Sequence, residues 1–245
     1  MRVFLDPGHG GDDPGACFKA LKEKNLTLAI ALRIRDQLAS QKEVIIKLSR
    51  HTDETCSLSK RVKLAEGFKA DLYVSIHINA GGGSGFESFR YLKTGKDTVE
   101  LHQLFHRTMI ETLQVTNRGL KRGDFYVLRQ TSMAAVLTES LFIDHPSDYE
   151  NLMKPSMIDR IVKAHVLAIL SIKNKDVNKG SFVCGSFQSE ALAQKRGREL
   201  IAADFQVRIK SISVKGAPFY RVMVNETGDT KAKLQLLGYD AFKVN

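Results

Sequence analysis

The sequence predicts an α/β protein: a twisted, mostly parallel sheet with helices on both faces, followed by a small α+β domain. Short apolar runs alternate with stretches of helical period through about residue 172, which is typical of a parallel sheet covered on both sides. A polar stretch at 174–180 lacks periodicity, and the pattern changes after it. The chain has 245 residues, enough for one large domain or for one medium and one small domain.

The first strand is expected at the very start of the chain. Residues 1–5 form an apolar run, and the glycine-rich turn at 6–11 breaks it at once. His9 stands at the end of this strand, where neighbouring glycines let the backbone fold closely around a ligand. Open α/β sheets bind ligands beyond the carboxyl ends of their strands, so His9 is a candidate ligand residue.

The alternation continues through the first domain, where apolar runs predict strands and periodic stretches predict helices. Ser57 and Asp97 are expected to cap helices, with Arg61 and Lys63 on a solvent-facing helix surface. We expect, in chain order, a helix over 25–39, a strand over 43–50, a helix from 57 to about 68, strands over 71–76 and 86–92, a helix over 97–113, strands over 125–129 and 134–138, and a helix over 156–172.

The C-terminal part has a different pattern, a strand–helix–strand unit that occurs twice. Two such units in tandem commonly form a ferredoxin-like sandwich, with a four-stranded sheet and two helices on one face. We therefore expect a first domain over 1–173, a linker over 174–180 and a second domain over 181–245. The repeated elements are strands over 182–187, 205–214, 219–224 and 239–244, with helices over 189–203 and about 229–237.

Composition limits the classes of partner. The net charge of +10 favours an anionic partner, such as nucleic acid, a membrane surface or an acidic wall polymer, or serves only solubility. No helix-turn-helix, zinc-finger spacing or aromatic stacking sheet is recognisable, so we expect no nucleic-acid partner. Three scattered cysteines, Cys17, Cys56 and Cys184, are expected to be free thiols.

The chain shows no apolar stretch of about 18 residues, and its N-terminal apolar run belongs to the fold. We therefore expect no membrane insertion and no secretory signal. The expectation is synthesis in the cytoplasm, with access to an external target only after lysis or release.

Four residues are expected at the same edge of the sheet. His9 follows the first strand, His77 the third and Glu139 a later one, while Glu23 begins the first long helix. Two imidazoles and a carboxylate suit tetrahedral zinc, and a fourth position left to water marks a catalytic site. In this interpretation Glu139 takes the proton of that water and passes it to a leaving nitrogen.

Each residue also has a simpler interpretation. His9 alone fits a turn cap, and His77 alone fits a buried histidine bonded to a backbone carbonyl. Glu23 alone is best explained as a charge at a helix N-terminus, worth about 0.5 kcal/mol. Glu139 is harder to explain in this way, because a carboxylate at the end of an apolar strand needs a partner or a function.

Six motifs in register resemble the zinc-dependent N-acetylmuramoyl-L-alanine amidases, the amidase_3 family, over residues 1–172. They are LDPGHGG at 5–11, EKNLTLAIAL at 23–32, SIHINA at 75–80, GFESF at 85–89, NRGLKRGDFYVLR at 117–129 and AVLTESLFIDHPSD at 135–148. The resemblance implies that one Zn²⁺ is held by His9, Glu23 and His77, with Glu139 as catalytic acid/base. It implies hydrolysis of the amide between N-acetylmuramic acid and the first L-alanine of the stem peptide. Asn79 and Arg118 are candidate substrate-binding residues beside this site.

The tail resembles SPOR domains, which bind peptidoglycan glycan strands, through FVCGSF at 182–187, FYRVMV at 219–224 and LGYDAFKV at 237–244. The alternative for this segment is a folding or interaction appendage without a sugar site. Together the two resemblances imply a peptidoglycan partner and a wall-lytic enzyme, either a phage endolysin or a sporulation mother-cell autolysin. A non-catalytic wall-binding scaffold with an inactive amidase domain is the alternative function.

Overall fold

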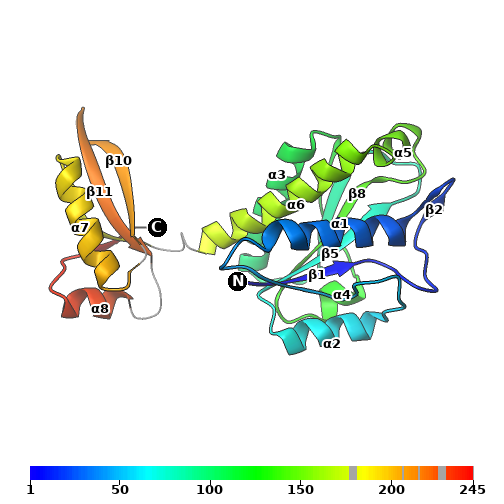
Figure 1. Ribbon diagram of the computed structural model, residues 1–245, viewed down its shortest axis with the longest axis horizontal. Helices are drawn as coiled ribbons and strands as arrows, with labels where there is room; N and C mark the ends of the chain where they lie inside the picture. Colours follow the sequence, from blue (N-terminus) through cyan, green and yellow to red (C-terminus); the bar gives the residue numbers. More distant parts are fainter. Residues whose placement is uncertain (177–180, 206, 215, 226–229, 245) are drawn as a thin grey trace. The chain divides into compact units, whose positions relative to one another are not determined.

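The computed structural model describes residues 1–176, 181–205, 207–214, 216–225 and 230–244 (Figure 1). The chain divides into two compact units, Met1–Ile172 and Lys173–Asn245, and each is described by itself. No helix among the described residues is both long enough and apolar enough to cross a membrane.

The first unit is built on a six-stranded sheet. Its strand order is β4-β1-β5-β8-β6-β7, and all neighbouring strands are parallel except the antiparallel pair β6 and β8. The predicted mostly parallel sheet is therefore confirmed. Its strands are β1 (Arg2–Pro7), β4 (Ile45–Leu48), β5 (Leu72–Asn79), β6 (Phe86–Arg90), β7 (Asn117–Arg122) and β8 (Ala134–Phe142).

Helices cover both faces of this sheet, as predicted (Figure 1). One face packs against α1 (Glu23–Leu38), α3 (Lys96–Leu113) and α6 (Pro155–Asp176), and the other against α2 (Leu58–Phe68) and α4 (Tyr126–Gln130). In β1, Val3 and Leu5 point into the first core and Phe4 into the second. A strand buried on both faces has consecutive apolar residues, which is why residues 3–5 are all apolar.

Four short elements were not predicted. A two-stranded hairpin, β2 (Cys17–Phe18) and β3 (Leu21–Lys22), leads directly into α1. Helix α5 (Pro146–Leu152) follows β8. Strand β7 was also missed; its sequence, NRGLKR, is largely exposed and polar, because it is the last strand at one edge of the sheet.

Two predictions about helices in the first unit were wrong. Residues 126–129, predicted as part of a strand over 125–129, form most of α4, with Phe125 as its N-cap residue, because a five-residue apolar run cannot distinguish a strand from a helix. The residue at the N-cap of α3 is Gly95, and Asp97 lies inside the first turn, where its charge still favours the helix N-terminus. Ser57 does cap α2, with its hydroxyl accepting from the Lys60 backbone N–H.

Arg61 corrects the prediction of a solvent-facing helix surface. Its side chain is buried and forms an ion pair with Asp6, with 2.5 Å between Nη1 and Oδ1, while Lys63 is exposed as expected. Asp6 also accepts hydrogen bonds from the Tyr73 hydroxyl and from Ser75 Oγ. A buried charge is tolerated when it is paired and hydrogen-bonded in this way.

The second unit is a four-stranded antiparallel sheet with strand order β10-β11-β9-β12. Helix α7 contributes Ala193 and Leu200 to its core, and α8 contributes Leu234. This is the predicted ferredoxin-like arrangement. Its elements are β9 (Ser181–Phe187), α7 (Glu190–Ala202), β10 (Val207–Val214), β11 (Ala217–Asn225), α8 (Thr230–Leu236) and β12 (Phe242–Val244).

The predicted linker over 174–180 falls partly on helix and partly outside the description. Helix α6 continues through Asp176. Residues 177–180 lie outside the described residues.

Candidate metal centre and active site

His9 occupies a sharp turn at the end of β1. Its φ of 62° lies in the left-handed region, which non-glycine residues rarely adopt. The residue before it must be glycine, because a Cβ on Gly8 would lie 2.2 Å from the ring of His77. The backbone of the turn therefore packs directly against the second histidine.

Two buried arginines donate hydrogen bonds to the backbone of this turn. Arg50 donates to the backbone oxygens of Pro7 and Gly8, at 3.2 and 2.9 Å. Arg61 donates to the oxygens of Pro7 and His9, at 2.8 and 2.6 Å. Charged donors to backbone carbonyls form strong hydrogen bonds, so these side chains fix a strained turn that the local sequence alone would not hold.

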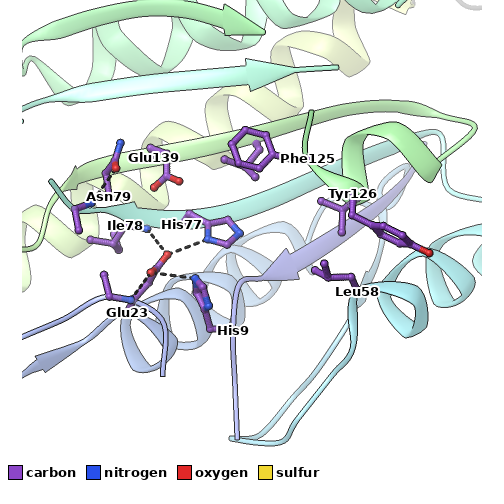
Figure 2. A pocket seen from close by; sticks show the side chains of 13 residues that line it. His9, Glu23, Leu58, His77, Ile78, Asn79, Phe125, Tyr126 and Glu139 are labelled. Carbon is purple, nitrogen blue, oxygen red and sulfur yellow. Dashed lines mark hydrogen bonds and ion pairs between the residues drawn. The ribbon is translucent and has the colours of Figure 1, made fainter. Parts of the chain in front are cut away.

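Glu23 is the first residue of α1 and points between the two histidines (Figure 2). One carboxylate oxygen lies 2.9 Å from His77 Nδ1 and the other 3.0 Å from His9 Nε2. The backbone N–H groups of Ile78 and Ala16 donate to the same carboxylate, at 3.0 and 2.9 Å. Burial favours the neutral acid, but the hydrogen bonds from the histidines outweigh it and hold the pKa of Glu23 well below its usual range.

His9, Glu23 and His77 together form a group that fits a metal ion. One candidate ligand atom from each residue lies within 4.8 Å of the others. The two imidazole rings meet edge to face, with centroids 5.0 Å apart. Asp13 Oδ2 lies 2.8 Å from the remaining ring nitrogen of His9, the kind of outer partner that orients a metal-binding histidine. Two nitrogens and one carboxylate oxygen are a donor set suited to zinc.

Glu139 lies on β8 directly beside His77, its register partner on β5, and its carboxylate points into the same pocket (Figure 2). Its Oε2 atom is enclosed and makes no hydrogen bond to any described residue. Burial, followed by the negative charges of Glu23 and Glu87, holds the pKa of Glu139 well above its usual range. The side chain is therefore disposed to hold a proton.

The pocket around these residues has a volume of about 380 Å³. The three candidate metal ligands and Glu139 lie toward one end of it, with Asn79 nearby (Figure 2). The other end is apolar and includes two side chains that are exposed to solvent, Leu58 by 53% and Tyr126 by 36%.

The remaining two predicted residues, Asn79 and Arg118, meet at a residue that the sequence analysis missed. Asn79 Nδ2 donates to Glu87 Oε1 at 2.9 Å, and Arg118 Nε donates to Glu87 Oε2 at 2.8 Å. Asn79 lines the pocket, whereas Arg118 lies beyond it on β7. Glu87 carries the same signal in the sequence as Glu139, a carboxylate within an apolar strand.

The other histidines do not join this group. His102 and His106 are buried on α3 and both contact Ser88 Oγ at 2.7 Å. His165 is buried on α6 beside Thr138 Oγ1, at 3.0 Å. These three belong to the helix-covered face opposite α2 and α4, and we interpret them as structural groups.

Comparisons with known proteins identify the family of each unit. Residues 3–171 match the N-acetylmuramoyl-L-alanine amidase family, and residues 181–243 match the SPOR domain. The sporulation-specific N-acetylmuramoyl-L-alanine amidase of Bacillus subtilis is 43% identical over 67% of this chain and 65% of its own length. The endolysin of Bacillus phage SPP1 is 41% identical over 73% of this chain and 68% of its own length.

A solved structure shows the same fold for the first unit. The N-acetylmuramoyl-L-alanine amidase from Clostridium difficile 630 is similar with a TM-score of 0.68 and 34% sequence identity. The match covers 71% of this chain and 96% of that one. The chain therefore belongs to the N-acetylmuramoyl-L-alanine amidase family, as a peptidoglycan amidase with a C-terminal SPOR domain.

Proposed function

We propose that the chain cleaves the amide between N-acetylmuramic acid and L-alanine with one zinc ion held by His9, Glu23 and His77. The observation that carries the proposal is the convergence of these three residues, from two strand ends and a helix start, with ligand atoms within 4.8 Å. Bound zinc supplies Lewis acidity, which polarises a carbonyl oxygen and makes a coordinated water more acidic.

The protein side chains supply orientation and proton transfer. The Glu23 carboxylate accepts hydrogen bonds from two backbone N–H groups, so it stays ionised as a ligand. Its contacts with both histidines keep their rings oriented toward the site. Glu139 faces the same pocket with an enclosed oxygen that has no partner among the described residues. When ionised, this carboxylate would accept a proton from the attacking water, and its raised pKa favours keeping that proton until it is delivered to the departing amide nitrogen.

We expect Glu139→Gln to lower kcat on purified cell walls by about 100-fold or more, the usual contribution of a general acid/base. The amide of glutamine keeps the size of the side chain but cannot take up the proton. Metal analysis should still find about one zinc per chain, because Glu139 is not among the three proposed ligands. The readout is the release of L-alanine amino groups without new reducing sugar ends.

Glu150→Gln, at an exposed position on α5, is the matched control and should retain the wild-type rate. Cleavage by Glu139→Gln at the wild-type rate would refute the acid/base assignment. Wild-type protein that hydrolyses walls without bound metal would refute the zinc proposal.

The SPOR domain supports a second part of the proposal, attachment of the enzyme to its polymeric substrate. Peptidoglycan is the partner that both domains share. In this proposal the second unit binds the wall and raises the local concentration of the catalytic unit on it.

A further inference from the structure

The polar side chains near the site lie in a row across the sheet. The strand order β5-β8-β6-β7 carries them in sequence: His77 on β5, Glu139 on β8, Glu87 on β6, and Arg118 with Lys121 on β7. Neighbouring strands lie about 4.8 Å apart, so β7 is about 10 Å from the strand of the catalytic glutamate. The row leads from the metal-binding group toward a pair of cations.

Glu87 is the residue that holds these cations in place. It is buried, pairs directly with Glu139 across β6 and β8, and therefore points to the same face of the sheet. Lys121 Nζ and Arg118 Nε both contact Glu87 Oε2, at 2.6 and 2.8 Å. Two positive charges face one negative charge, so the cluster keeps a net positive charge for a further anion.

Arg118 presents the part of its side chain that suits such an anion. It uses only Nε toward Glu87, and its terminal Nη groups make no hydrogen bond to any described residue. The guanidinium lies over the Phe142 ring, 4.7 Å from the centroid, and the side chain is 34% exposed. A planar guanidinium held at one edge presents its remaining N–H groups to a carboxylate in a fixed direction.

The chemistry of the substrate decides which anion this is. The lactyl carboxyl of muramic acid is part of the scissile amide, so the nearest free carboxylate belongs to the stem peptide. The second peptide residue is a glutamate joined through its side chain, which leaves its α-carboxylate free or converted to a carboxamide. Two residues span about 7 Å of extended chain, and the long arginine side chain, which extends from β7 to Glu87 on β6, covers part of the remaining distance.

Building on the proposed function, we propose that Arg118 and Lys121 bind the free α-carboxylate of this glutamate. Their ion pairs with Glu87 hold both side chains in position. The enzyme would therefore prefer walls in which this carboxylate is not amidated. The peptide then runs from the metal-binding group toward β7. Asn79, which bonds Glu87 and lines the pocket, connects the cluster to the catalytic site.

The test compares two synthetic muramoyl-peptides that differ only in this group, carboxylate or carboxamide, with the full-length zinc-loaded enzyme. Wild type should show kcat/KM about tenfold higher for the carboxylate, the usual scale of a charge-assisted hydrogen bond. In Arg118→Gln this ratio should fall toward one, mainly through a higher KM for the carboxylate substrate. Arg122→Gln is the control, since its pairing with Arg90 places it on the other face of β7 from Lys121, and it should keep the wild-type ratio.

Equal kcat/KM of the wild type for the two substrates would overturn the specificity proposal while leaving the amidase function intact. An unchanged ratio in Arg118→Gln would also overturn it, because the arginine would then have a structural role only. Failure to cleave either substrate would contradict the proposed function itself. This outcome differs from equal cleavage of the two, which contradicts only the specificity proposal.

Discussion

At the scale of single residues, the site depends on how closely the backbone of the first loop approaches the second histidine. Gly8 lies against the His77 ring, and Gly15 lies against His9 and Glu23. At both positions a Cβ would fall within 2.7 Å of these side chains. The glycines therefore set the spacing of the proposed ligands as much as the ligands themselves do.

Gly8→Ala should lower zinc affinity at least tenfold, because its Cβ would displace the His77 ring or the turn that carries His9. Gly67→Ala is the matched control: it lies in helix α2, and a Cβ there meets no atom within 4 Å. That variant should stabilise the protein by about 0.5–1 kcal/mol and leave zinc binding unchanged. Competition titration with a chromogenic chelator measures both affinities; equal values for Gly8→Ala and wild type would contradict the argument.

The sequence predicts best the residues that follow an apolar run, although β5 and β8 continue past His77 and Glu139 to Asn79 and Phe142. His9, His77 and Glu139 all follow or end apolar runs, so a single rule about parallel sheets places them at one edge. Glu87 was missed although it carries the same signal as Glu139. Arg61 was wrongly placed on the surface, because its partner Asp6 lies 55 positions away and helical periodicity does not reveal it.

At the scale of elements, short apolar segments are where prediction fails. Residues 125–129 have the composition of a strand, yet all but the first belong to helix α4, with Val127 and Leu128 packed into the core beside α2. Long periodic helices such as α1 and α3 were placed within two residues at each end, because burial of one face imposes the period. Tertiary packing decides between helix and strand only where local pattern is too short to do so.

Two buried histidines, on the sheet face that α1, α3 and α6 cover, make the free energy of unfolding sensitive to acid. Burial lowers the pKa of His165 on α6 to about 4, and burial together with the charge of His106 lowers the pKa of His102 on α3 to about 4. Below about pH 6.5 the unfolded chain takes up protons that these folded sites do not. The free energy of unfolding should therefore fall as the pH drops from about 6.5 to about 4.

His165→Gln should reduce this acid sensitivity. A shift of this size corresponds to about 3 kcal/mol, so wild type should lose about that much more unfolding free energy than the variant between pH 7 and pH 4. His51→Gln, at an exposed loop position, should follow the wild-type pH dependence. Urea unfolding of the larger unit at several pH values measures the difference, and parallel curves for His165→Gln and wild type would contradict the role of burial.

At the scale of the whole molecule, net charge and the second unit are separate explanations for wall binding. Residues 177–245 contain 11 Lys or Arg and 6 Asp or Glu, which is half of the net charge of +10. If charge alone attracted the anionic wall, each half would contribute similarly, and salt would weaken both by screening. If the SPOR domain recognises the wall by specific contacts, its contribution should persist at high salt.

A chain ending at Asp176 separates these explanations and keeps α6 whole. The first unit has its own core, and the Clostridium difficile structure is matched over 96% of its length by 71% of this chain, so the truncated form should fold. It should cleave soluble muramoyl-peptides at the full-length rate, because every residue of the proposed site lies before residue 140. At about 0.5 M salt the Debye length is about 5 Å, so attraction between exposed charges is weak. In sedimentation with purified walls at this salt concentration, the full chain should remain bound and the truncated form should not. Equal retention of the two forms would assign wall binding to the catalytic unit, and loss of both would assign it to charge.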